Sequence, residues 1–156
     1  MPDDPPVYRP SIAEVSSYIR ARTKIAGGGI AGVFTEETNI KAKEVEPLID
    51  QAVGLILSDI GGVPCNEGLE GQMKTVAAIL AAMLVEQSFF PEQTIGAGNS
   101  FNSLEKLYKP KMQALSNQVQ RECGTGSGGE DGSEGSAISR ATFDSRRLLG
   151  PTFPAW

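Results

Sequence analysis

The sequence predicts an all-α protein: a small bundle of four to five helices, with a long loop after the first helix and an extended C-terminal arm. Three observations lead to this fold class. Apolar residues recur at helical spacing in several segments of the first 123 residues. Apolar residues make up 40% and charged residues 21% of the 156-residue chain, which is typical of a globular domain. A Gly- and Ser-rich stretch then separates this region from the last residues.

These changes in composition divide the chain into four parts. Residues 1–10 contain four prolines and are expected to form an extended leader. Residues 11–123 are expected to form the helical bundle domain. Residues 124–137 are expected to form a flexible Gly/Ser linker, and residues 138–156 a C-terminal docking arm.

The first helix begins with a capping-box sequence at Ser11 and Glu14. In this motif the Ser side chain accepts from the Glu backbone amide, while the Glu side chain reaches back to the Ser amide. The helix is expected to run to about residue 22. The apolar residues of one helical face are Ile12, Val15, Tyr18 and Ile19.

Helical periodicity stops in residues 23–41, where glycines interrupt the apolar residues. This pattern favours a long loop or a loose β-hairpin. A connection of this length in a small domain is usually functional or ordered by neighbouring subunits. We therefore single out Ile30, Val33 and Phe34 as a possible inter-subunit loop.

The second helix has the clearest pattern in the chain. Apolar residues in the range 45–60 follow i, i+3, i+4, i+7 spacing, and Gly61-Gly62 ends the helix. Pro47 removes one amide donor near the start. Either residues 42–46 form a separate turn, or the regular helix begins close to Pro47.

A third helix is expected at residues 69–89, ending before Pro91. Its middle, residues 76–85, is apolar on all sides, so we place it at the centre of the bundle. Because this apolar run has only ten residues, we expect no membrane partner.

A last helical pattern covers residues 101–119, with Pro110 in its middle. This favours a kink, or two helices meeting near Lys109, over one straight helix.

Charge and cysteine content limit the function classes. The net charge is −5 and no stretch is rich in Lys or Arg, so binding of nucleic acid through its phosphates is not expected. Cys65 and Cys123 form no CxxC pair, and we expect two free thiols.

The residues needed for common catalytic sites are missing. The chain has no His, which excludes Ser-His-Asp, Cys-His and HExxH sites. Its acidic pairs lie at predicted helix starts or in loops. The helix dipole accounts for the pairs at helix starts. Residues 27–32 match GxGxxG but lack the βαβ context of a dinucleotide site. We therefore expect no enzyme, and no catalytic, cofactor-binding or metal-binding residue.

Arg20, Arg22 and Lys24 form a tight basic cluster at the end of the first predicted helix. They either interact with the C-terminal end of the helix dipole, or contact an acidic partner or DNA.

The C-terminal arm combines apolar anchors with arginines, the residue types enriched at protein interfaces. The linker has a reach of roughly 20 Å for some 13 residues. The arm is expected to bind a partner as an added strand or in a groove. The predicted partner-binding residues are Arg140, Phe143, Arg146, Arg147, Leu148, Leu149, Phe153 and Trp156.

Four segments resemble the head-to-tail adaptor (head-tail connector) proteins of long-tailed bacteriophages, and most of all those of phages that infect actinobacteria. The segments are VYRPSIAEV (residues 7–15), IRART (19–23), GVFTEET (32–38) and VEPLIDQA (45–52). The resemblance covers roughly residues 7–60. The family commonly has Pro-Thr where this chain has Ile40-Lys41.

The resemblance implies an α-helical structural protein of the virion, made in the host cytoplasm. It implies a ring of twelve copies beneath the portal, extending the channel through which genomic DNA passes without sequence-specific binding. The implied partners are the portal protein, the stopper and other copies of the chain. In related adaptors the C-terminal segment reaches the portal. Two other classes remain open: a stand-alone interaction module whose tail binds a protein, and a nucleotide-binding enzyme using residues 27–32.

Overall fold

The structure is a computed structural model that describes residues 5–93 and 99–124. Within these residues the regular elements are all helices, and there is no strand. The prediction of a small all-α bundle is confirmed. The elements are α1 (Ile12–Tyr18), η1 (Arg20–Arg22), α2 (Ala42–Ile60), α3 (Glu67–Phe89), η2 (Pro91–Gln93) and α4 (Ser100–Glu122). The arm, residues 138–156, and nearly all of the linker lie outside the described residues.

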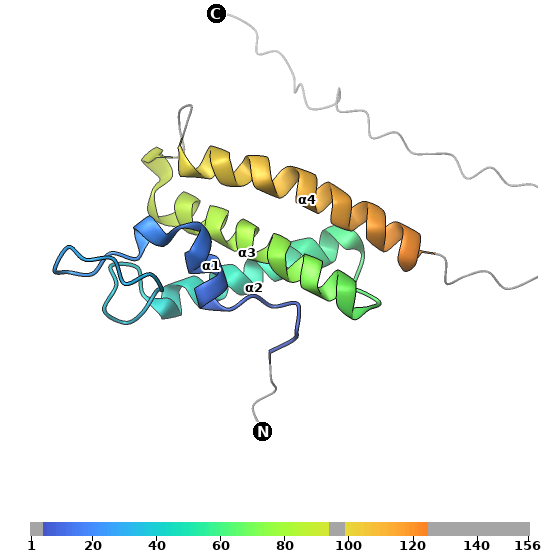
Figure 1. Ribbon diagram of the computed structural model, residues 1–156, viewed down its shortest axis with the longest axis horizontal. Coiled ribbons are helices and arrows are strands. Elements are labelled where there is room, and N and C mark those ends of the chain that lie inside the picture. The colour runs from blue at the N-terminus through green and yellow to red at the C-terminus, as the bar shows by residue number, and fades with distance from the viewer. Residues whose placement is uncertain (1–4, 94–98, 125–156) are drawn as a thin grey trace, which may run out of the picture.

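Helix α3 is the centre of the bundle, as its sequence predicts. It contacts α1, α2 and α4, and Figure 1 shows it running between α4 and α2. Most of its middle segment is buried, because small residues such as Ala77, Ala78 and Ala81 let the neighbouring helices approach closely, and only Leu80 and Leu84 in this segment are partly exposed. Around it lie two groups of buried apolar residues, one toward each end of the bundle.

The first helix is shorter than the sequence pattern indicates. Ser11 caps α1 as expected, but α1 ends at Tyr18, and the chain continues as the 3₁₀ helix η1 to Arg22. The break falls at Ile19, whose φ of −129° and ψ of 40° leave the helical region.

Helix α2 begins at Ala42 and continues through Pro47, so both predicted alternatives for its start were wrong. Lys41 has no side-chain acceptor, but its amide donates to Glu44 Oε2 at 2.7 Å, which satisfies that donor. Pro47 cannot donate to the Lys43 carbonyl. Both residues are exposed, so water can replace this bond.

Helix α4 is likewise one continuous helix through Pro110, so the alternative of two helices meeting near Lys109 was wrong, and a kink at Pro110 stays a prediction. Pro110 and Lys106, whose carbonyl loses its donor, both lie on the exposed side of α4. An exposed proline therefore costs the helix less than the sequence pattern alone suggests.

The two cysteines form a disulfide, which corrects the expectation of free thiols. Cys65 precedes α3 and Cys123 caps the end of α4; their Cα atoms are 5.8 Å apart. A spacing of 58 residues gave no sign that the antiparallel packing of α3 and α4 brings these positions together.

Candidate functional site

Two structural features lie at opposite ends of the bundle (Figure 1). At one end, residues 23–41 project beside the end of α3. At the other end, the disulfide ties the end of α4 to the loop between α2 and α3. The linker to the predicted docking arm starts at this second end.

Buried hydroxyl groups hold the base of the loop in residues 23–41. Ser16 Oγ accepts from the Phe34 amide at 3.2 Å, and Thr23 Oγ1 accepts from the Gly32 amide at 2.8 Å. Thr38 Oγ1 accepts from the Thr35 amide at 2.9 Å. Isolated antiparallel bridges pair Lys24 with Ile30 and Ile25 with Thr38. Of the predicted loose β-hairpin, the described residues therefore contain only these bridges and no strand. The loop is therefore a defined structure.

The three predicted inter-subunit residues of this loop differ in burial. Ile30 is 56% exposed and Val33 is 37% exposed, so both can contact another molecule. Phe34 is 2% exposed and packs in the main core beside residues such as Val15 and Ile40. It therefore anchors the loop within its own chain, and its side chain is not available to a neighbour.

The basic cluster is divided between two roles. Arg22 Nε and Nη2 donate to Glu86 Oε1 and Oε2 at 2.8 and 2.7 Å, and the guanidinium lies 3.9 Å from the ring centre of Phe90. A Cβ atom placed at Gly32 would lie 3.4 Å from Arg20 Nε, so the Arg20 guanidinium lies beside this glycine. Lys24 is exposed. Arg22 therefore joins η1 to α3, and Lys24 is left on the surface.

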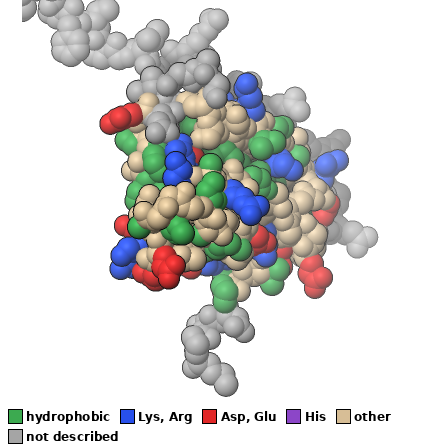
Figure 2. Space-filling view, turned by 60° about the vertical axis from the view of Figure 1, so that its left-hand side comes forward, with side chains coloured by type: hydrophobic (Ala, Val, Ile, Leu, Met, Phe, Trp, Pro, Cys, Tyr) green, Lys and Arg blue, Asp and Glu red, His purple; other side chains and the backbone are tan. Residues whose placement is uncertain are grey.

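A surface cavity of about 390 Å³ opens beside this cluster. Its lining comes from η1, from both ends of the loop and from the end of α3. The lining residues are Ala21, Arg22, Lys24, Asn39, Ile40, Phe89 and Phe90. Figure 2 shows hydrophobic, basic and acidic side chains interspersed on the face at this end of the molecule. Aromatic rings beside an ammonium group suit a peptide with apolar and acidic residues.

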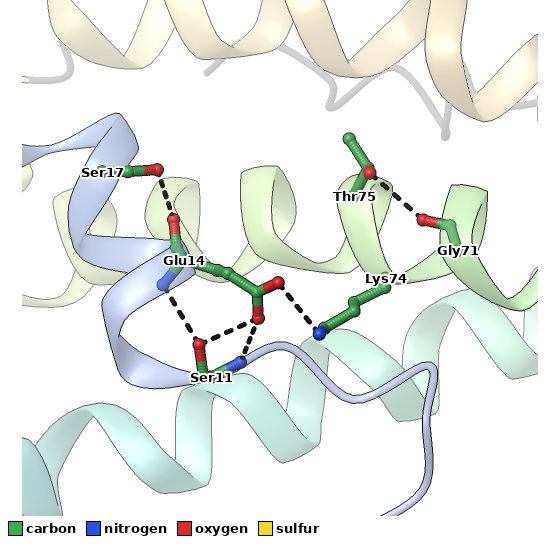
Figure 3. A network of polar contacts seen from close by, with 6 residues as sticks. All are labelled: Ser11, Glu14, Ser17, Gly71, Lys74 and Thr75. Carbon is green, nitrogen blue, oxygen red and sulfur yellow. Dashed lines mark hydrogen bonds and ion pairs between the residues drawn. The ribbon is translucent and has the colours of Figure 1, made fainter.

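A network of polar contacts joins α1 to α3 (Figure 3). Glu14 Oε2 accepts from the Ser11 amide at 2.7 Å, Ser11 Oγ accepts from the Glu14 amide at 3.3 Å, and Lys74 Nζ lies 2.9 Å from Glu14 Oε1. Burial raises the pKa of Glu14, but the hydrogen bonds from Ser11 and Lys74 outweigh it, and the pKa is lowered. The network is structural: every group in it has a partner within the chain.

Among the described residues, no His, Cys, Asp and Glu side chains form a group that could hold a metal ion. Residues 27–32 follow η1, and the next helix starts only at Ala42, so the helix that would hold a pyrophosphate is missing there.

By length and composition, α3 could cross a membrane, with a mean hydropathy of 1.3 over its most apolar 18 residues. In the structure, 56% of that window is buried inside the bundle. The core helix of a soluble protein passes the same test, so this is weak evidence for a membrane span.

The predicted partner-binding residues of the arm, from Arg140 to Trp156, lie outside the described residues. Sequence reasoning missed Glu86, the acidic partner of Arg22. One signal was present: Glu86 directly follows the apolar run of α3, where a charge needs a partner. Comparison of the chain with protein families, curated proteins and solved structures found no match.

Proposed function

We propose that this protein is a head-to-tail adaptor of a long-tailed bacteriophage. In this proposal, copies of the chain form a ring beneath the portal that extends the DNA channel and links the capsid to the stopper. The family resemblance implies twelve copies in the ring. The observation that carries the proposal is the resemblance of residues 7–60 to this family.

The structure supports the proposal because the resembling segments contact one another. Arg9 Nε donates to Asp50 Oδ1 at 2.7 Å, and the same guanidinium pairs with Glu46. Ser11 and Glu14 form the cap of α1, and Phe34 packs beside α1 and α2. The four segments therefore specify one structural unit, made of the leader, α1, the loop and α2.

The charge of the protein is compatible with a channel wall. With a net charge of −5, the chain has little tendency to bind the DNA that passes it. Adaptors need contacts on two sides, toward the capsid and toward the tail. In the bundle, the loop with exposed Ile30 and Val33 lies at one end, and the linker to the arm starts at the other.

The arm accounts for attachment to the portal in this proposal. Apolar anchors beyond a Gly/Ser-rich linker add binding energy once the body of the protein is bound, because they act at high effective concentration. Within a ring, this gain is repeated at every subunit.

A truncation tests the proposal. Deleting residues 138–156 is expected to leave the helical bundle folded and to abolish attachment to purified portal particles, with rings visible by electron microscopy only for the full chain. A matched control replaces residues 138–156 by a Gly/Ser segment of equal length, which keeps the chain length without the anchors. Wild-type occupancy of the truncated chain on portal particles would refute the docking role of the arm. A full chain that never joins portal particles would refute the adaptor proposal and favour the stand-alone interaction module.

A further inference from the structure

The cavity at the loop end has chemistry that the adaptor proposal leaves unused. Phe89 is 37% exposed although it is a large aromatic residue, and it lines the cavity together with Phe90 and Ile40. Lys24 also lines this cavity, and it makes no ion pair with the described residues. The charge of Arg22 is already balanced by Glu86. The cavity therefore offers aromatic surface and one net positive charge.

The Asn39 side chain adds a polar group to this surface. Asn39 is exposed, and its amide side chain can donate to a backbone carbonyl of a bound peptide. Aromatic surface combined with such donors is the arrangement that binds proline-rich segments in extended conformation, because these segments are pre-ordered and expose their carbonyls.

One segment of this chain has the matching chemistry. Residues 2–7 read Pro-Asp-Asp-Pro-Pro-Val, which combines three prolines with two acidic residues. Pro5, Pro6 and Val7 are exposed, and Val7 is 68% exposed. These apolar side chains are therefore not buried by other residues of their own bundle.

We propose that the cavity lined by Lys24, Phe89 and Phe90 binds residues 2–7 of a second copy of the chain. The prolines pack on the phenylalanine rings, and Asp3 and Asp4 face Lys24. The inference rests on the proposed ring, since it needs a neighbouring copy. The contact joins two different surfaces, so it is heterologous and can close a ring.

Two other occupants fit less well. Figure 1 shows the described part of the leader, residues 5–10, running away from the loop end of its own bundle, so the same chain would have to double back to fill its own cavity. The C-terminal arm carries Arg140, Arg146 and Arg147, which Lys24 would repel.

The test is a titration followed by NMR. The full-length chain, labelled with ¹⁵N and carrying Asp3→Asn and Asp4→Asn to weaken its own leader, is titrated with a peptide of residues 2–8 that is blocked at both ends. We expect saturable shifts of the Lys24, Asn39, Phe89 and Phe90 amides. Adding Lys24→Glu or Phe89→Ser to the labelled chain should weaken binding tenfold or more. The matched control is Lys109→Glu, which changes an exposed lysine on α4 and should leave binding unchanged.

The outcomes separate this inference from the adaptor proposal. No shift of the cavity amides at millimolar peptide overturns the inference, as does binding that Lys24→Glu leaves intact. Stronger binding of a peptide of residues 138–152 at the same amides also overturns it. Attachment to portal particles is scored separately. A chain that binds the peptide but not the portal removes only the adaptor proposal, and the reverse result removes only this inference.

Discussion

Arg22 and Glu86 form a two-pronged ion pair between η1 and the C-terminal half of α3, with N–O distances of 2.8 and 2.7 Å. Glu86 is 1% exposed, so a charged carboxylate at this position would destabilise the fold without the arginine as its partner. The pair fixes the start of the loop in residues 23–41 to the central helix.

Removing this arginine should destabilise the fold strongly. Arg22→Met leaves the buried Glu86 carboxylate without its ion-pair partner, and we expect a loss of about 3–5 kcal/mol in the free energy of unfolding. Urea denaturation measures it. Lys109→Ala breaks the exposed ion pair with Glu105 and serves as the control, with an expected loss of about 0.5 kcal/mol or less. Equal losses in the two variants would contradict the structural role of the buried pair.

The cap of α1 should give a pH-dependent stability. The pKa of Glu14 is lowered from its ordinary value of 4.5, so its contribution is fully present above pH 4.5 and is lost as the pH falls through the folded-state pKa. The stability difference between the wild type and Glu14→Gln should therefore be constant above about pH 5.5 and shrink below pH 4.5. Denaturation curves between neutral and acid pH test this. A difference that grows on acidification would show that the sign is wrong.

The hydroxyl of the same cap can be tested at fixed pH. Ser11→Ala should cost about 1 kcal/mol, because the Glu14 amide loses its acceptor. Ser17→Ala is the control: its hydroxyl also bonds within α1, to the Glu14 carbonyl, but it satisfies no free amide at the helix start. Similar stability of the two variants would argue against the capping role.

Burial within the loop predicts contrasting effects of two substitutions. Phe34→Ala removes a core side chain and should cost about 3–5 kcal/mol. Ile30→Ala, at a 56% exposed position, should change the stability by no more than about 0.5 kcal/mol. Thermal or urea unfolding of both variants checks this. A large loss for Ile30→Ala would mean that its side chain supports the fold of the single chain.

The disulfide should contribute measurably to stability. It closes a segment of 58 residues, for which loop-closure entropy predicts about 4 kcal/mol. Cys65→Ser should lower the unfolding free energy by an amount of this order, and a reducing agent should do the same to the wild type. The double variant Cys65→Ser/Cys123→Ser should not respond to the reducing agent. An unchanged wild type under reducing conditions, with reduction confirmed by mass spectrometry, would contradict this prediction.

The sequence predicted the helices well because their apolar spacing is strong. The centre of α3, the capping box at Ser11 and the end of α2 at Gly61 follow from local patterns, which need no knowledge of distant contacts. The errors at Pro47 and Pro110 have a common cause. A proline is costly inside a helix when its missing hydrogen bond is buried, and sequence alone did not show that both lie on exposed faces.

The candidate site was less predictable because it depends on contacts between distant residues. Arg22 meets Glu86 across 64 positions, and Cys65 meets Cys123 across 58. Phe34 follows a glycine-rich stretch and was predicted as a possible inter-subunit residue, yet its amide donates to the Ser16 hydroxyl and its ring packs in the core. The packing of α1 on α3 brings Arg22 to Glu86, and the antiparallel packing of α3 and α4 brings Cys65 to Cys123.

The position of the disulfide determines how the bundle would carry mechanical load. If the arm held a partner and tension acted on residue 124, a helix without a cross-link would peel from its last turn, one hydrogen bond at a time. Cys123 is covalently joined to Cys65, so the force passes directly into the start of α3, the innermost helix. Pulling on the arm would then strain the whole bundle at once and leave the end of α4 in place.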